Sequence, residues 1–132
     1  MKLAKTIGSS QKIFISIACF CDPDVVNTVK DCFDKASSPA RVGIGVCLQA
    51  KPSDASYDEL NDIARVRVDR IDVTEARGPI YARARCEALM TDADYFLQID
   101  CHSRFFPGWD EILIQEFAKA LELNDNAVLS HY

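Results

Sequence analysis

Two short apolar runs constrain the fold of this chain more than any other feature. IFISIACF, at residues 13–20, is almost continuously apolar and rich in β-branched residues, and VGIGVCLQ, at 42–49, has the same character. Continuous rather than alternating hydrophobicity is typical of strands buried on both faces, as in parallel sheets covered by helices. The glycines of the second run, Gly43 and Gly45, further predict a close approach of the backbone to a neighbour.

Helix signals lie between the apolar runs. Asp22-Pro23-Asp24 supplies an N-cap, a proline at the first helical position and an acid in the first turn, and so predicts a helix over 23–36. A second helix should begin at Gly78-Pro79, with a stripe of Ile80, Ala84 and Ala88. The third and most amphipathic helix is predicted at 109–123 with apolar positions Trp109, Ile112, Leu113, Phe117, Ala120 and Leu121.

Further strands are predicted at 65–73 and 94–99, and another should begin within 127–132. Alternation of strands and helices predicts an α/β fold with a mostly parallel sheet, right-handed crossovers and helices on its faces. The length of 132 residues suits one domain, which we expect to span 12–132 after a flexible segment at 1–11.

Composition excludes several classes of function. The net charge is −5 and no basic block occurs, which disfavours nucleic acid and anionic membranes as partners. The N-terminus superficially resembles a signal peptide, but a CDPD turn closes its apolar run, and no transmembrane span is predicted. Six cysteines lie within strands and helices rather than loops, which favours reduced thiols and a cytoplasmic protein.

The strand at 94–99 delivers two candidate metal ligands. In sheets of this kind ligands bind beyond the carboxyl ends of strands, and Asp100 and His102 follow this strand. If the chain stays extended, their side chains project to the same side and form half of a divalent-metal site. The mixed oxygen and nitrogen donors favour Mn²⁺ over Mg²⁺. The alternative is that Asp100 caps a turn and His102 is a polar surface residue.

A helix start at the neighbouring strand end could hold an anion. Arg77 and Arg83 lie near the start of the helix predicted to begin at Gly78-Pro79, where free N–H groups and guanidinium groups suit phosphate. Solvated surface charge is the alternative for each arginine. Together with a divalent cation at the next strand end, they would form a nucleotide-diphosphate site.

Five segments in this order resemble a known family: SIACFCDP, VGIGVCLQ, EARGPIYARARCEALM, DYFLQIDCHSRFFPGWDEILIQEF and AVLSHY. They are similar to the GlcNAc-transferase family that contains the cytoplasmic enzyme acting on hydroxyproline. More distantly, 78–83 and 100–102 resemble the Gly-Leu-Ile-Arg-Ala-Arg and Asp-x-His segments of the polypeptide GalNAc-transferases. The resemblance covers residues 12–132.

This resemblance implies a GT-A fold whose donor half binds a UDP-sugar, with UDP-GlcNAc as the expected donor. Asp100 and His102 would hold Mn²⁺ on the diphosphate, and the sugar would pass to a hydroxyl of a protein or glycan with retention of configuration. The residues implied around the nucleotide and sugar are Ala18, Cys19, Phe20, Gln49, Arg77, Gly78 and Cys101.

The chain also departs from the family pattern. A third metal ligand comes from the acceptor half in the polypeptide enzymes, whereas this chain ends at Tyr132, and the family counterpart of His131 is not usually a ligand. Cys101 replaces a small serine- or alanine-like residue. We therefore expect the donor half without its acceptor half, and no general base is identified.

Two other classes of function remain open. Cys19, Cys21, Cys101 and His102 all follow or end predicted strands and could form a zinc or redox module. A non-enzymatic interaction domain is the other alternative, in which Phe105 and Phe106 form bare surface and lead to self-association.

Overall fold

The computed structural model describes residues 11–130. The predicted flexible segment 1–11 therefore lies outside the described residues except for Gln11, as do His131 and Tyr132. The strands are β1 (Ile13–Phe20), β2 (Val42–Ala50), β3 (Val66–Asp72) and β4 (Tyr95–Asp100). The α-helices are α1 (Val25–Lys35), α2 (Pro79–Glu87) and α3 (Trp109–Leu123), and three 3₁₀ segments are η1 (Pro39–Arg41), η2 (Ala55–Asp62) and η3 (Val73–Glu75).

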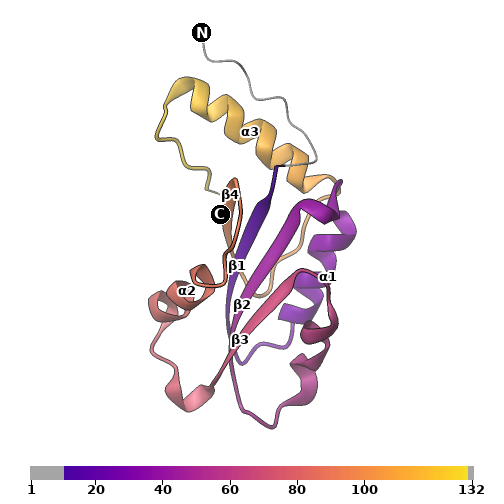
Figure 1. Ribbon diagram of the computed structural model, residues 1–132, viewed down its shortest axis with the longest axis vertical. Helices are drawn as coiled ribbons and strands as arrows, with labels where there is room; N and C mark the ends of the chain where they lie inside the picture. The colour runs from indigo at the N-terminus through magenta and orange to yellow at the C-terminus, as the bar shows by residue number, and fades with distance from the viewer. Residues whose placement is uncertain (1–10, 131–132) are drawn as a thin grey trace.

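The four strands form one parallel sheet in the order β3-β2-β1-β4. The helix α1 connects β1 to β2, whereas α2 connects β3 back across the sheet to β4. Right-handed crossovers that run in opposite directions place their helices on opposite faces, and Figure 1 shows α1 and α2 on the two sides of the sheet. The predicted α/β architecture, a Rossmann-like sheet flanked by helices, is confirmed.

The core has two parts, one on each face of the sheet. On the α1 face, Ile13, Ile15, Ile17 and Cys19 of β1 join a large buried cluster with residues of β2, α1 and α3. On the α2 face, a smaller cluster contains Cys47, Ile71, Ala82 and Cys86. Burial on both faces is the reason that β1 and β2 are apolar at consecutive positions.

Only one of the two glycines in β2 is required by a close approach. A Cβ atom at Gly45 would lie 2.6 Å from Cζ of the buried Phe14 ring, whereas one at Gly43 would meet nothing within 4 Å. The predicted close approach is therefore confirmed at Gly45 and wrong at Gly43.

Two predicted helix faces are wrong in detail. On α2 the buried residues are Ala82 and Cys86, one turn apart, while Ile80 lies two positions away on another side of the helix and is 82% exposed. On α3 the sheet is covered by Trp109 and Ile114, and Ile112 is exposed. The spacing of apolar residues therefore predicted the helices correctly, but it did not predict which residues face the sheet.

The strand predicted to begin within 127–132 is absent from its described part, residues 127–130. The backbone N–H of Ala127 donates to the carbonyl of Asn124 in a turn instead. Within residues 11–130, no helix combines the length and apolar character that crossing a membrane requires.

Candidate functional site

The sheet contains a topological switch point between β1 and β4. From β1 the chain moves outward through β2 and β3, and then returns to form β4 on the other side of β1. Ala18 is paired with Asp100 near the carboxyl ends of these two strands. The segments that follow both strands continue onto the α1 face, where hydrogen bonds join them. Ligands of open α/β sheets bind outside the carboxyl ends of the strands at such a switch point.

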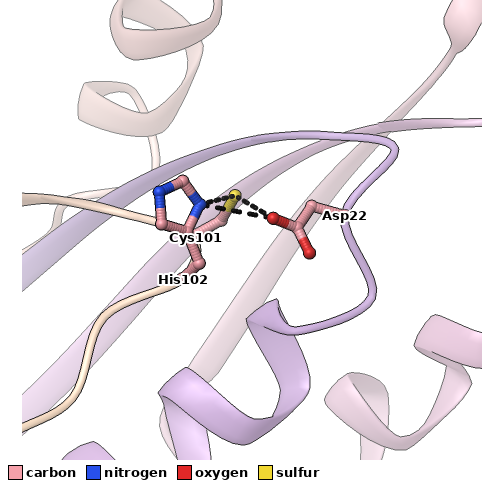
Figure 2. Close-up of side chains that lie close together, drawn as sticks. All are labelled: Asp22, Cys101 and His102. Carbon is pink, nitrogen blue, oxygen red and sulfur yellow. Dashed lines mark hydrogen bonds and ion pairs between the residues drawn. The ribbon is translucent and has the colours of Figure 1, made fainter.

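Three potential ligand side chains from these two segments meet at the switch point: Asp22, Cys101 and His102. The Nδ1 atom of His102 lies 3.3 Å from Oδ2 of Asp22 and 3.8 Å from Sγ of Cys101, and that sulfur lies 3.6 Å from the same oxygen. Figure 2 shows the three side chains pointing toward one another, with the second ring nitrogen of His102 on the far side of its ring.

The segment after β4 is fixed by a buried hydroxyl of α1. Thr28 donates to the carbonyl oxygen of Cys101 at 2.8 Å and accepts from the backbone N–H of Ser103 at 3.0 Å. The hydroxyl is fully buried, so these bonds form away from competing water. Thr28 thus holds the turn that carries Cys101 and His102 against the first turns of α1.

An ion pair strengthens the same connection. Arg104 donates two hydrogen bonds to the carboxylate of Asp24, at 2.7 and 3.1 Å. These bonds, with one from Asn27, lower the pKa of Asp24 below its usual value. The backbone N–H of Phe105 donates to Asp31 at 2.7 Å, so the segment is attached to α1 along its length.

The segment after β1 is shaped by a turn at Asp22. Oδ1 of Asp22 accepts from the backbone N–H of Asp24 at 3.0 Å, and its carbonyl oxygen accepts from the thiol of Cys19 at 3.2 Å. The other carboxylate oxygen, Oδ2, faces Cys101 and His102. Both segments that supply the cluster are therefore fixed before any ligand binds.

Burial raises the pKa values of the two thiols at this end of the sheet, Cys19 and Cys101. Burial raises the pKa of Cys19 to about 12. Burial and the neighbouring charge of Asp22 also raise the pKa of Cys101. Both thiols are protonated at neutral pH in the absence of a cation.

Asp100 and His102 do not lie on one extended segment. The strand β4 ends at Asp100, and Cys101 and His102 form a turn, so the alternation on which the pairing was predicted does not apply. As the register partner of Ala18, Asp100 belongs to the α2 face of the sheet, whereas Cys101 packs in the α1-face cluster. Joint binding of a metal ion by Asp100 and His102 stays a prediction.

The residues predicted around the nucleotide occupy different environments. Phe20 is exposed at the end of β1, opposite Gln49 of β2. Gln49 is buried and its amide donates to the carbonyl oxygen of Cys19 at 3.1 Å, and the Cys19 side chain is itself fully buried.

Gly78 and Arg77 precede α2, as predicted. Gly78 has a φ of 88° and is the N-cap residue, a conformation that favours glycine. The guanidinium group of Arg77 lies 5.4 Å from the centroid of the Tyr81 ring. Arg83 lies within α2 and is partly buried.

The predicted set of Cys19, Cys21, Cys101 and His102 is only partly brought together. Cys21 adopts a positive φ of 50°, and its exposed thiol donates to the carbonyl oxygen of Gln49. The third member of the cluster is Asp22, which the sequence indicated only as a helix cap. Asp22 could have been identified as a member of the cluster if the strand order, with β1 beside β4, had been known.

Of the two aromatic side chains predicted to be exposed, Phe105 and Phe106, only Phe106 is exposed. Phe106 is 80% exposed, but Phe105 packs on Trp109 with ring centroids 4.9 Å apart. The Trp109 indole N–H donates to the carbonyl oxygen of Cys32, so this tryptophan belongs to the core.

Fold and site together define the class of protein. An open parallel sheet with helices on both faces is a Rossmann-like fold, in which ligands commonly bind at the switch point. A family model described as "Glycosyltransferase (GlcNAc)" matches residues 12–64 and 57–132. The chain therefore belongs to the GlcNAc glycosyltransferase family, whose members transfer a sugar from a donor to an acceptor. A comparison with curated proteins found no match.

Proposed function

We propose that this chain binds a UDP-sugar, UDP-GlcNAc in the first instance, as the donor domain of a retaining GT-A glycosyltransferase. The observation that carries the proposal is the match to the GlcNAc glycosyltransferase family across residues 12–64 and 57–132. A hydroxyl group of a protein or glycan is the proposed acceptor. The switch point between β1 and β4 supports this function because it is where sheets of this topology bind nucleotides.

The donor chemistry at the end of β4 fits a divalent cation. Asp100 supplies an exposed carboxylate, and the imidazole of His102 has its second nitrogen on the side away from Asp22. Oxygen and nitrogen donors together suit Mn²⁺. When bound, this ion would neutralise negative charge on the diphosphate of the leaving UDP.

Asp22 has a positioning role in this proposal. Its carboxylate lies 3.3 Å from Nδ1 of His102, so it can accept the Nδ1 proton and leave the other nitrogen free for a cation. Histidine ligands are commonly oriented in this way by a carboxylate.

The remaining predicted residues would surround the nucleotide. Arg77, Gly78 and Arg83, at the start of α2, would face the diphosphate and sugar. Cys101 would lie beside the sugar or ribose. At the ends of β1 and β2 the proposed uridine contacts are Ala18, Cys19, Phe20 and Gln49, of which Phe20 is the most exposed.

The cellular setting is also part of the proposal. All six cysteines are free thiols, five of them buried. Thiols are maintained in this state in reducing compartments, which supports a cytoplasmic location. The net charge of −5 supports a small-molecule donor and a protein or glycan acceptor rather than nucleic acid or a membrane surface.

Calorimetry of UDP binding with and without Mn²⁺ tests the proposal. We expect Mn²⁺ to strengthen UDP binding, and Asp100→Ala to remove most of that effect because one cation ligand is lost. Asp92→Ala is the matched control, since Asp92 is an exposed acid before the amino end of β4 and pairs with Lys12. Arg77→Ala should weaken UDP binding without changing the binding of Mn²⁺ alone.

Equal UDP affinity with and without Mn²⁺ would contradict the cation assignment. Absence of UDP binding under all conditions would contradict the donor assignment as well.

A further inference from the structure

The cluster of Asp22, Cys101 and His102 contains three different donor atoms, and one of them is sulfur. The Mn²⁺ site proposed above takes neither the thiol of Cys101 nor the Nδ1 atom of His102 as a ligand, and in that arrangement Nδ1 donates to Asp22. The three atoms Oδ2, Sγ and Nδ1 face one another across the switch point (Figure 2).

The spacing of these atoms matches a tetrahedral zinc site. With zinc–ligand distances of about 2.0–2.3 Å and tetrahedral angles, nitrogen and oxygen lie about 3.4 Å apart, and sulfur lies about 3.6 Å from each. The corresponding separations in the protein are 3.3 Å between nitrogen and oxygen, 3.6 Å between sulfur and oxygen, and 3.8 Å between sulfur and nitrogen. Each side of the ligand triangle is therefore within about 0.2 Å of the length that a central zinc ion requires.

Charge and access agree with this geometry. A thiolate and a carboxylate balance the two positive charges of the ion, and a neutral imidazole completes the set. Cys101 is 8% exposed and closes the inner side, whereas the His102 side chain is 63% exposed and leaves an outer side for a fourth ligand such as water.

We propose that Asp22, Cys101 and His102 form a binding site for a thiophilic divalent cation, with Zn²⁺ as the expected ion. Thiolate donors select zinc over hard cations such as Mn²⁺. Binding forms a Zn–S bond and releases the thiol proton of Cys101 to solvent, with no change of oxidation state. The ion connects the segment after β1 to the segment after β4. This site does not depend on the binding of a UDP-sugar. When zinc is bound at Nδ1 the other ring nitrogen carries the proton, so His102 serves the zinc site or the Mn²⁺ site and not both at once.

Titration of the metal-free, reduced protein with Co²⁺ tests the site, since Co²⁺ reports a thiolate ligand through a ligand-to-metal charge-transfer band. We expect one equivalent of Co²⁺ to produce this band with the intense visible absorption of a tetrahedral ion, and Zn²⁺ to displace it. Cys101→Ser should remove the band and weaken Zn²⁺ binding at least about tenfold, because loss of an outer-shell partner alone weakens metal binding by about 10–100-fold.

Cys21→Ser is the matched control, because Cys21 is an exposed thiol next to Asp22 whose sulfur bonds to the Gln49 carbonyl instead. It should leave the spectrum unchanged. Asp22→Asn should weaken Zn²⁺ binding but keep the charge-transfer band at saturating Co²⁺, which separates loss of a ligand from loss of folding. A missing band in the unsubstituted protein, or a band that survives in Cys101→Ser, would overturn the proposal.

Failure of this inference is distinguishable from failure of the proposed function. UDP binding with Mn²⁺ is measured separately, on the unsubstituted protein. Mn²⁺-dependent UDP binding without a cobalt–thiolate band would overturn only the zinc site, whereas the reverse result would overturn only the UDP-sugar assignment.

Discussion

At the scale of single residues, a hydroxyl group at the start of α1 organises the candidate site. Thr28 is buried, accepts from the backbone N–H of Ser103 and donates to the carbonyl oxygen of Cys101. A turn that carries functional side chains needs its backbone polar groups satisfied, and one side chain from another element supplies both bonds here. The position of His102 therefore depends on a residue that has no role in ligand chemistry.

Thr28→Val tests this dependence, because valine keeps the side-chain shape and removes the hydroxyl. We expect a loss of about 1–3 kcal/mol in the free energy of unfolding, since the Ser103 N–H is left without this partner. Faster hydrogen exchange at the Ser103 amide should accompany the loss. Thr74→Val, at an exposed threonine bonded to Asp72, should change stability by less than about 0.5 kcal/mol. Unaltered exchange at Ser103 would contradict the role of Thr28.

At the scale of elements, a buried ion pair joins α3 to the connection between α1 and β2. The carboxylate of Asp110, in the first turn of α3, accepts from the backbone N–H groups of Ser37 and Ser38 and from Arg41. Both charged side chains are almost completely buried. Burial alone would raise the pKa of Asp110, but these hydrogen bonds outweigh it and lower the pKa.

Asp110→Asn should reduce the free energy of unfolding at neutral pH by about 3–5 kcal/mol, because it breaks the buried ion pair between Asp110 and Arg41. The lowered pKa of Asp110 means that its stabilisation is complete above the unfolded value of about 3.9 and is lost as the pH falls through the folded value. The unsubstituted protein should therefore lose the stabilisation contributed by ionised Asp110 on acidification, whereas the Asp110→Asn variant has no such contribution to lose.

Chemical denaturation at several pH values measures both effects. Glu116→Gln on the same helix is the control, because its exposed pair with Lys119 should contribute no more than about 1 kcal/mol. An Asp110→Asn variant as stable as the unsubstituted protein would contradict this account.

At the scale of the whole molecule, two oppositely directed crossovers create the site. The α1 and α2 helices cover opposite faces (Figure 1), and β1 and β4 become neighbours whose following segments meet on the α1 face. The same sheet carries both parts of the core and the candidate site, so ligand binding and global unfolding should be coupled.

UDP with Mn²⁺ should therefore raise the temperature of unfolding in one cooperative transition. At concentrations one hundred times the dissociation constant, the gain is about 2.7 kcal/mol, or about 10 °C for a domain of this size. Calorimetric scans should show a smaller gain with UDP alone and little additional effect of Mn²⁺ in Asp100→Ala. A ligand-insensitive transition would show that the nucleotide does not bind the native fold.

The sequence by itself determined the class of fold and most of the secondary structure, although not the strand predicted to begin within 127–132. The runs at 13–20 and 42–49 carry apolar residues on both faces of their strands, which is typical of a parallel sheet with helices on both sides. The bounds of β1 and α3 agree with those predicted. Family membership was also available from the ordered motifs, because these are local stretches of the chain. The residues of α2 and α3 that face the sheet could not be predicted, because the packing of the whole fold decides which side of each helix is buried.

Only the tertiary structure decided which side chains meet at the site. Asp22 is about 80 residues from His102 in the chain, and their contact follows from the strand order that places β1 beside β4. Local pattern predicted that Asp100 and His102 would share one extended segment, but the turn at Cys101 and His102 is fixed by Thr28 from another element. Contacts of this kind are long-range, and residue spacing along the chain holds no information about them.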